Sequence, residues 1–363
     1  MSTFFPLETY SRRLNLVTNL AAKAGLDGIV ITPGPDMEYL LGLTISTHER
    51  FTALVVTTKE RKVIVPAVDA ADVRNSAAGE LGVEVIGWRD GEDPYAPITP
   101  GDYAVSASTT ADHLLELQNR GLKTVNATQV LAQGFVRKEA AELEQLRRAS
   151  SAIDEVHRAV PGLLKAGVTE NEVAAELEKL ILREHVAVDF IIVGSGPHGA
   201  DPHHSHSDRV IEDGDVVVVD LGGTLDSGYH SDCTRTYVVG EASAEQRDIY
   251  ATLKRAHQAG LGFAKPGVTA GDIDKVVRDV LTEAGYGEYF SHRTGHGIGL
   301  STHEEPFLLA GNDFVIEEGM CFSIEPGVYF TGQWGARIED IVVVTADGVE
   351  PINTTSHELL SVG

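Results

Sequence analysis

The chain has 363 residues, more than one hydrophobic core usually holds, so two domains are expected. Its 54 acidic and 29 basic residues give a formal charge of -25, which argues against nucleic-acid or anionic-membrane binding because such surfaces need a basic patch. Two cysteines are too few for a disulfide framework, the start lacks a signal-peptide core, and no apolar run approaches the roughly 18 residues of a membrane span, so we expect a cytoplasmic protein.

Short apolar runs alternate with helical patterns over residues 1–135. The runs are DGIVIT (27–32), FTALVVTT (51–58), KVIVPA (62–67), VEVIGW (83–88) and DYAVSA (102–107), and a helical pattern surrounds HLLELQ (113–118). Strands interleaved with helices are typical of a small α/β domain. The helix-favouring segment 136–167 follows, and we interpret it as the joint between two domains.

Residues 136–363 contain an internal repeat. KAGVT at 165–169 recurs as KPGVT 100 residues later, and the same offset pairs His203 with His303. VIEDGDVVVVD, which ends at Asp220, lines up with VIEEGMCFSIE, which ends at Glu325, at an offset of 105 that leaves five residues for a loop. Each unit reads as a helix, a glycine-rich histidine segment and strands. The repeat predicts two similar halves that face each other across a cleft.

The first repeated strand leads into a predicted hairpin. After Asp220 the sequence LGGTLDSGYHSDCTRTYVV supplies turn residues and then a second strand. A turn centred on Asp226 would place Asp220 directly opposite Asp232, with Cβ atoms roughly 5 Å apart. By the strand period Cys233 would then point away from Asp232, which argues against a thiol nucleophile.

The second half repeats this pattern. From Glu325 the chain reads PGVYFTGQWGARIEDIVVV, and a turn centred on Gly332 would place Glu325 opposite Glu339. Four carboxylates on two hairpins would repel one another, by about 4 kcal/mol for a pair 4 Å apart near a protein surface. Two divalent cations would nearly neutralise them. Arg337 shares a strand face with Glu339 and would orient a metal-binding carboxylate.

Three histidines stand among glycines in SHRTGHGIGLSTHE at 291–304. The glycines would each cost a helix interior roughly 1 kcal/mol, so we expect an extended, bending segment instead. Such a segment could bring His296 to the carboxylates as the imidazole ligand, with His292 and His303 facing a substrate. Among the histidines of GPHGADPHHSHSD, only His203 has a repeat partner, and we expect the others to be loop residues.

These motifs resemble a known family. DLGG with Asp220, SDCTRT with Asp232, TGHGIGL with His296, SIEPGVY with Glu325 and RIED with Glu339 resemble the pita-bread metallopeptidases, which include methionine aminopeptidase, aminopeptidase P and prolidase. The resemblance implies an α+β, pseudo-two-fold pita-bread catalytic domain over residues 136–363. The preceding α/β domain, residues 1–135, resembles the creatinase-like N-terminal domain of the proline-specific branch.

The resemblance also implies an activity, namely hydrolysis of Xaa-Pro peptides at two divalent metal ions, with Mn expected and Co or Zn as alternatives. Asp232 and Glu339 would bridge the ions, with Asp220 on one and His296 and Glu325 on the other. The expected catalytic residues are His203, His292, His303, Glu325 and Arg337. The expected substrate-binding residues are Arg50, His203, His292, His303 and Tyr329. A homodimer is also expected.

We predict that the protein is a prolidase, which cleaves Xaa-Pro dipeptides. The alternative is an aminopeptidase P, which acts on longer peptides. A dipeptidase must hold the free carboxylate of proline, and arginine does this best because its planar fork donates two hydrogen bonds. Some prolidases carry that arginine directly after HE-x-P, but here HEEP is followed by Phe307. We therefore predict that Arg50, in ISTHERFTALVV, takes this role.

Two further classes of protein are disfavoured. A creatinase-like amidinohydrolase would share the fold and work without metal, but creatinases lack several of the acidic ligands that are intact here. A non-enzymatic binding protein of this fold should have lost ligands and gained basic tracts, and the chain shows neither.

Overall fold

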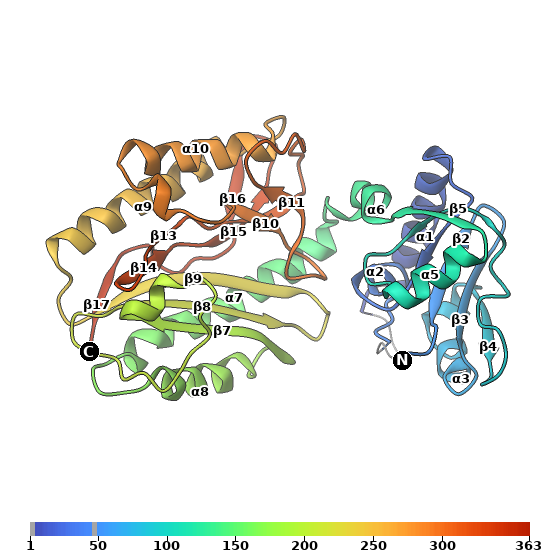
Figure 1. Cartoon of the computed structure of the whole chain (residues 1–363), viewed down its shortest axis with the longest axis horizontal. Coiled ribbons are helices and arrows are strands. Elements are labelled where there is room, and N and C mark those ends of the chain that lie inside the picture. Colours follow the sequence, from blue (N-terminus) through green and yellow to red (C-terminus); the bar gives the residue numbers. More distant parts are fainter. Residues whose placement is uncertain (1–3, 46–48) are drawn as a thin grey trace. The chain divides into compact units, whose positions relative to one another are not determined.

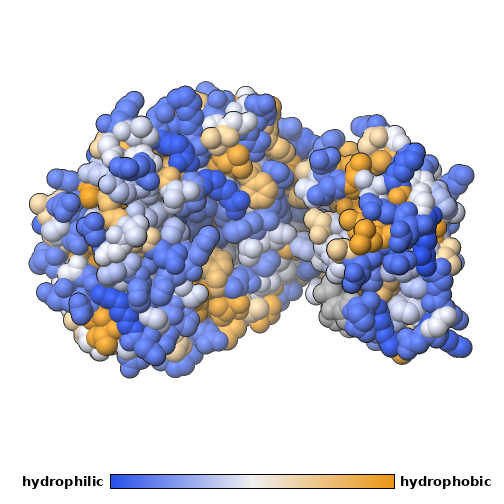
Figure 2. Space-filling view, viewed as in Figure 1, coloured by the Kyte–Doolittle hydropathy of each residue, from blue (hydrophilic) through white to orange (hydrophobic). Residues whose placement is uncertain are grey.

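The computed structural model describes residues 4–45 and 49–363. The chain divides into two compact units, Met1–Phe135 and Val136–Gly363, and each has hydrophobic clusters of its own. Most of the surface seen in Figure 2 is hydrophilic, as expected for a chain with 23% charged residues. Within the described residues, no helix combines the length and the apolar character that crossing a bilayer requires.

The first unit is built on a mixed six-stranded sheet with the order β4-β3-β2-β1-β5-β6. Its strands are β1 (Gly28–Ile31), β2 (Ala53–Thr57), β3 (Arg61–Pro66), β4 (Glu84–Trp88), β5 (Gly101–Val105) and β6 (Leu122–Asn126). Its helices are α1 (Leu7–Lys23), α2 (Pro35–Leu41), α3 (Ala70–Arg74), α4 (Ala77–Glu80), α5 (Ala111–Asn119) and α6 (Thr128–Phe135). Every apolar run singled out in this unit forms a strand. The sequence analysis missed β6, because LKTVN is half exposed and lacks an apolar run.

The second unit consists of two halves that follow the repeat. The first half contains α7 (Ala140–Leu163), α8 (Glu170–Ile181), β7 (Ala187–Ser195), β8 (Val216–Thr224) and β9 (His230–Val239). The second half contains α9 (Ala244–Phe263), α10 (Ala270–Glu283), β10 (Gly295–Gly297), β11 (Glu304–Leu308), β12 (Cys321–Ile324), β13 (Gly327–Phe330), β14 (Trp334–Arg337), β15 (Asp340–Val344) and β16 (Val349–Pro351), and β17 (Leu360–Val362) ends the chain. The sheets lie between the helix pair α7 and α8 and the pair α9 and α10 (Figure 1). This is the expected α+β, pseudo-two-fold architecture.

The repeated KAGVT and KPGVT motifs form equivalent structures. Thr169 caps α8 and Thr269 caps α10, each through a capping box with the residue three positions on. Thr169 forms a β-bridge with Val210, and Thr269 forms one with Val315. The two halves of the repeat therefore begin in the same way, with a capped helix tied to the strand that leads to an acidic residue.

The first hairpin corrects one sequence-based expectation. Asp220 pairs with Thr234, and Asp232 pairs with Gly222, so the two aspartates are not directly opposite each other as predicted. The turn centres one residue later than Asp226 because Gly228, with φ of 82°, takes the left-handed position. Since the register moves by two residues, both carboxylates keep the same sheet face.

The second hairpin follows the expected register. Gly327 pairs with Arg337 and Ile324 pairs with Asp340, which centres the turn on Gly332, whose φ is 75°. Glu325 and Glu339 stand at the corresponding positions between these two pairs. The chain leaves regular strand geometry there, so the two glutamates flank a break in the sheet.

The alternation along β8 separates the core from the polar face. Val217, Val219 and Leu221 are fully buried in the cluster formed with α7 and α8. Asp220 projects to the opposite face, as the period of two requires. On the other side of the unit, Val328 and Ala336 of β13 and β14 pack in the cluster formed with α9 and α10. The helices thus cover the outer faces, and the polar residues are left on the inner ones.

We expect Thr169→Ala and Thr269→Ala each to lower the free energy of unfolding by about 1 kcal/mol, because each removes an N-cap acceptor. Urea unfolding measures the change. Serine at the same positions keeps the oxygen and serves as the matched control, so alanine and serine variants of equal stability would contradict the role of these caps.

Candidate metal centre

Five residues from five separate stretches of sequence converge on the inner face of the second unit. Asp220 and Asp232 come from β8 and β9, His296 from β10, and Glu325 and Glu339 from the two sides of the second hairpin. One ligand atom each from Asp220, Asp232 and Glu339 lie within 4.8 Å of one another, and the same holds for His296, Glu325 and Glu339. The two groups share Glu339. All five predicted metal ligands are therefore brought together.

The glycines around His296 allow this convergence. A Cβ atom at Gly295 would lie 1.9 Å from the backbone oxygen of Ser323, and one at Gly297 would lie 2.2 Å from that of Glu305. The segment is a short strand between two others, so the backbones approach more closely than any side chain would permit. The expectation of an extended segment is confirmed.

The imidazole of His296 is oriented toward the carboxylates. Its Nδ1 lies 3.1 Å from the backbone oxygen of Gly297, which leaves Nε2 as the free ring nitrogen. That Nε2 lies 3.3 Å from Oε1 of Glu325 and 3.7 Å from Oδ2 of Asp232. Burial lowers the pKa of His296 to about 3, and the nearby charge of His303 acts in the same direction. The imidazole is therefore neutral, as a metal ligand must be.

The carboxylates cannot all carry their charge in the protein alone. Burial, together with the charge of Glu339, raises the pKa of Asp232 well above its ordinary value. Burial and the charge of Glu325 do the same to Glu339. The pKa of Glu325 is raised to about 7, again chiefly by burial. Divalent cations would remove this penalty.

The donor atoms fit divalent metal ions. Oδ1 of Asp220 is buried and has no hydrogen-bond partner among the described residues, so an acceptor is available for a ligand. Four carboxylates and one imidazole form an oxygen-rich set of the kind that suits Mn and also accepts Co or Zn. The set does not resemble the thiolate sites of structural zinc or iron-sulfur centres.

Arg337 contacts the carboxylate cluster through Asp220 and Thr234. Its guanidinium donates to Oδ2 of Asp220 at 2.7 Å, to the hydroxyl of Thr234 at 3.0 Å and to the hydroxyl of Tyr329 at 2.8 Å. Thr234 in turn donates to Oε2 of Glu339 at 2.7 Å. Arg337 thus holds one carboxylate directly and a second one through a threonine. Its predicted contact with a metal-binding carboxylate is present in the structure.

The five residues line a cavity of about 670 Å³ together with other predicted site residues. His203, His292 and His303 also line it. The centre of the His303 ring lies 4.0 Å from that of His296, with the two ring planes tilted by 56°, and Nε2 of His292 lies 2.9 Å from the hydroxyl of Tyr329. Burial lowers the pKa of His292 to about 3 and also lowers that of His303, so both are neutral near pH 7. The cavity further contains Arg293, which the sequence analysis did not single out.

Arg50 lies in the first unit, where its guanidinium pairs with Asp90 at 3.0 Å. This ion pair lies on the surface, where such a pair contributes little to the stability of the protein. A contact of Arg50 with substrate stays a prediction.

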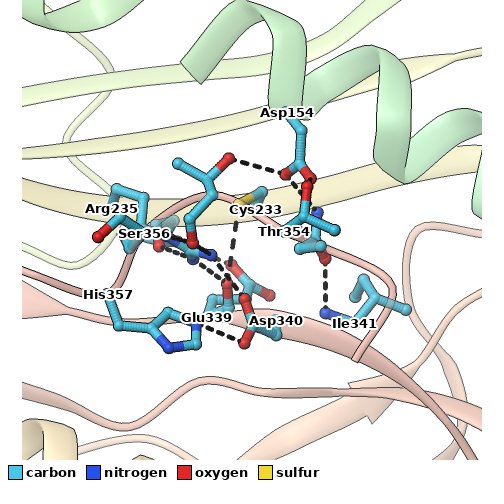
Figure 3. Close-up of polar contacts among 12 residues, drawn as sticks. Asp154, Cys233, Arg235, Glu339, Asp340, Ile341, Thr354, Ser356 and His357 are labelled. Carbon is cyan, nitrogen blue, oxygen red and sulfur yellow. Dashed lines mark hydrogen bonds and ion pairs between the residues drawn. The ribbon is translucent and has the colours of Figure 1, made fainter. Parts of the chain in front are cut away.

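A buried polar network links Arg235 of β9 to the segment around Glu339 and Asp340 and to residues near the end of the chain (Figure 3). Arg235 donates to the backbone oxygens of Glu339 and Thr234 at 2.5 Å and 2.8 Å, and it pairs with Asp340 at 2.7 Å. Asp340 also lies 2.7 Å from Nε2 of His357. Burial would raise the pKa of Asp340, but these partners lower it to about 2. Arg235 therefore fixes the backbone of one predicted ligand.

The same network anchors the segment before the last strand. Arg235 donates to the backbone oxygens of Thr355 and Ser356, and Asp154 of α7 accepts from Thr354 and Thr355 (Figure 3). The sequence analysis missed this network. Its members are separated by up to about 200 positions, and only Arg235, in the SDCTRT motif, and Glu339 and Asp340, in the RIED motif, lay in segments that carried a signal.

A second group of potential ligands lies at the start of α8. Glu170, His198 and His204 offer atoms within 4.8 Å of one another. The Glu170 carboxylate, however, accepts hydrogen bonds from Ser195 and Ser207 as well as from both histidines. Burial opposes its ionisation, but these donors lower its pKa to about 2. Both carboxylate oxygens of Glu170 therefore accept hydrogen bonds within the protein, whereas Oδ1 of Asp220 has no partner among the described residues.

The chain is similar to known proteins along almost its whole length. Residues 144–346 match the model of metallopeptidase family M24, and residues 13–160 match that of the creatinase/prolidase N-terminal domain. A Mycobacterium tuberculosis protein named "Probable dipeptidase PepE" is 51% identical, covering 99% of this chain and 98% of its own. An "Xaa-Pro dipeptidase" of Lactobacillus helveticus is 35% identical, covering 89% and 91%. The crystal structure of dipeptidase PepE from Mycobacterium ulcerans is 50% identical and superposes with a TM-score of 0.97, covering 99% of each chain.

The raised pKa values predict how the stability of the metal-free protein depends on pH. In the folded state Asp232, Glu325 and Glu339 retain protons that the unfolded chain has already released, so unfolding releases protons. Below about pH 6.5 the buried histidines act in the opposite direction, because His292 and His296, whose pKa is lowered to about 3, gain protons on unfolding. Above about pH 7 those histidines are neutral in both states, so the carboxyl groups dominate and stability should fall as pH rises further.

Thermal unfolding of chelator-treated protein at increasing pH above about 7 measures the effect, and Mn²⁺ added at the upper end of this range should reverse it. Asp232→Asn removes one of the charges and should make the fall shallower. A metal-free protein that becomes more stable across this range would contradict the prediction.

Proposed function

The chain belongs to metallopeptidase family M24, and we propose that it is a dipeptidase that hydrolyses the Xaa-Pro bond with two divalent metal ions. The observation that carries the proposal is the convergence of Asp220, Asp232, His296, Glu325 and Glu339 in one cavity. The chain is a hydrolase whose catalytic domain has the pita-bread fold and follows a creatinase-like N-terminal domain. Peptides are therefore its substrates, and the Xaa-Pro dipeptide is the finer proposal.

Asp232 and Glu339 would contribute to the binding of both ions, since each is a carboxylate that belongs to two of the candidate ligand groups, whereas Asp220 belongs to one. Asp220 would bind one ion, and His296 and Glu325 the other. Manganese is the proposed metal, with Co or Zn as alternatives. Bound divalent ions supply a hydroxide nucleophile at neutral pH and polarise the scissile carbonyl.

The remaining residues act on the substrate and its protons. His303, neutral and exposed to the cavity, is placed to donate a hydrogen bond to the oxygen of the scissile carbonyl. The proline nitrogen carries no hydrogen in the peptide and must gain a proton to leave. We assign this proton transfer to Glu325, with His203 and His292 positioned beside the substrate. Tyr329 holds the ring of His292 and accepts from Arg337.

The walls of the cavity support an apolar substrate ring. Phe190, Ile191, Ile192 and Pro202 line it alongside the polar groups. Because proline offers no N–H, recognition has to rely on the shape of its ring and on the neighbouring carbonyls. The Lactobacillus helveticus relative is named an Xaa-Pro dipeptidase, which supports this specificity. Aminopeptidase P activity on longer peptides is the alternative, and a homodimer in the cytoplasm remains a prediction.

The roles of the neighbouring histidines His296 and His303 can be separated. His303→Ala is expected to reduce kcat by about 100-fold or more, as loss of a hydrogen bond to the developing oxyanion does, while the metal content stays unchanged. His296→Ala should instead reduce the bound metal. Metal analysis and kinetics on both variants provide the comparison, and an exchange of the two results would show that the ligand assignment is wrong.

Substrate specificity is tested with Ala-Pro, Ala-Leu and Ala-Pro-Ala on the manganese-loaded protein. We expect the highest kcat/KM for Ala-Pro, because the proposed site recognises both the proline ring and the end of a dipeptide. Faster cleavage of Ala-Leu would contradict the Xaa-Pro proposal. Faster cleavage of Ala-Pro-Ala would assign the protein to the aminopeptidase P activity.

A further inference from the structure

We propose that a buried carboxylate in each half of the second unit is a positioning residue for one histidine of the cavity. In the first half Glu170 positions His203. In the second half Asp274 positions His292. The inference rests on the proposed peptidase function and adds to it two residues that act on catalysis through these histidines.

The two carboxylates make the same contact. One oxygen of Glu170 accepts from both the backbone N–H and the hydroxyl of Ser195, at 2.9 Å and 2.6 Å. One oxygen of Asp274 accepts from the same two groups of Thr294, at 3.1 Å and 2.8 Å. Ser195 ends β7, Thr294 directly precedes β10, and a glycine follows each of them. Each carboxylate thus fixes the point at which a strand meets a glycine-rich histidine segment.

The repeat alone does not account for this contact. At the offset of 100, Glu170 corresponds to Ala270 and Asp274 to Ala174. Glu170 is the first residue of α8, whereas Asp274 is the fifth residue of α10, so the two side chains reach equivalent points from different helix positions. Both are buried, with 0% and 1% of their surface exposed, and a buried carboxylate is unfavourable unless hydrogen bonds compensate for the lost water. The contact itself therefore accounts for an acid at each position.

Glu170 holds both ends of the segment that carries His203. Besides the contact with Ser195, its carboxylate accepts from the hydroxyl of Ser207 at 2.7 Å and lies 2.9 Å from Nε2 of His204. His203 directly precedes His204 and lines the cavity. Because the segment is held at both ends and beside His203, the imidazole extends from a fixed point, which reduces the entropy lost when it contacts a substrate.

Asp274 holds the segment that carries His292, partly through Arg278. The guanidinium of Arg278 donates two hydrogen bonds to the carboxylate, at 2.9 Å and 3.1 Å. It also donates to the backbone oxygens of Phe290 and His292, at 2.9 Å and 2.8 Å. With the contact at Thr294, the backbone is anchored before, at and after His292, which lines the cavity.

The effect on catalysis follows from the short range over which catalytic groups act. A displacement of about 1 Å can reduce a rate by about 100-fold. Loss of either carboxylate should therefore lower kcat although no group that touches the substrate is removed. The loss should also depend on the histidine that the carboxylate positions.

Double-mutant cycles on the manganese-loaded protein, with Ala-Pro as substrate, test this dependence. Glu170→Gln keeps the shape of the side chain and should lower kcat about tenfold. In a His203→Ala background the same substitution should have less than about a twofold effect, because the histidine that it acts through is already absent. In a His292→Ala background the full loss should remain, and Asp274→Asn should show the reverse pattern. Equal losses in both backgrounds would indicate general loosening of the fold and would overturn the inference.

Hydrogen exchange measured by mass spectrometry gives a readout that needs no activity. Exchange in residues 195–207 should accelerate in Glu170→Gln, and exchange in residues 290–295 should accelerate in Asp274→Asn, with the other segment unchanged in each case. Ser195→Ala and Thr294→Val remove only a hydroxyl donor and should show the same pattern more weakly. Thr294→Ser keeps the hydroxyl and should behave as the wild type.

Matched controls come from the same helices. Glu176→Gln of α8 and Asp279→Asn of α10 remove surface carboxylates paired with Lys179 and Lys275, and they should change neither kcat nor exchange. Unchanged exchange in both carboxylate variants would contradict the inference, as would a loss of bound metal that accounts for the lower kcat of Asp274→Asn. If the wild type cleaves neither Ala-Pro nor Ala-Leu, the proposed peptidase function fails, and the exchange comparison still decides whether the two carboxylates hold their segments.

Discussion

The repulsion among four buried carboxylates is the constraint on which the rest of the second unit depends. Asp220, Asp232, Glu325 and Glu339 lie close together in a cavity where water cannot screen them fully. Removing such groups from water is costly unless opposite charge accompanies them. Arg337 supplies one positive charge, and the raised pKa values of three carboxyl groups show that it is not enough. The geometry is therefore that of a site completed by divalent cations.

The surrounding structure holds this unfavourable cluster in position. The hydrophobic clusters formed with α7, α8, α9 and α10 cover the outer faces of the strands and fix their registers. Behind the ligands, Arg235 ties the backbone of Glu339 to Asp340 and to the segment that leads to the last strand. The repeat explains why two related hairpins meet, since each half contributes a strand with an acidic residue, Asp220 within β8 and Glu325 directly after β12. Stability contributed by the outer layers thus offsets the strain of the site.

Much of this could be predicted from sequence because the relevant signals are local. The strand period and the glycine-rich turns were enough to place all four carboxylates on the inner faces, even though the first turn was misplaced by one residue at Gly228. Contacts between distant segments carried no such signal. Asp154 and His357 belong to no motif, and their contacts with Thr355 and Asp340 arise only when the chain folds.

The central claim is that these carboxylates and His296 hold divalent ions, and metal content tests it most directly. Wild-type protein, Asp232→Asn and Glu339→Gln would be stripped with a chelator, reloaded with Mn²⁺, freed of excess metal and measured by elemental analysis, with circular dichroism to verify the fold. The account predicts two ions per chain in the wild type and fewer in both variants, because each substitution replaces a bridging carboxylate with a neutral amide. Wild-type protein that binds no metal, or variants that retain two ions per chain, would contradict it.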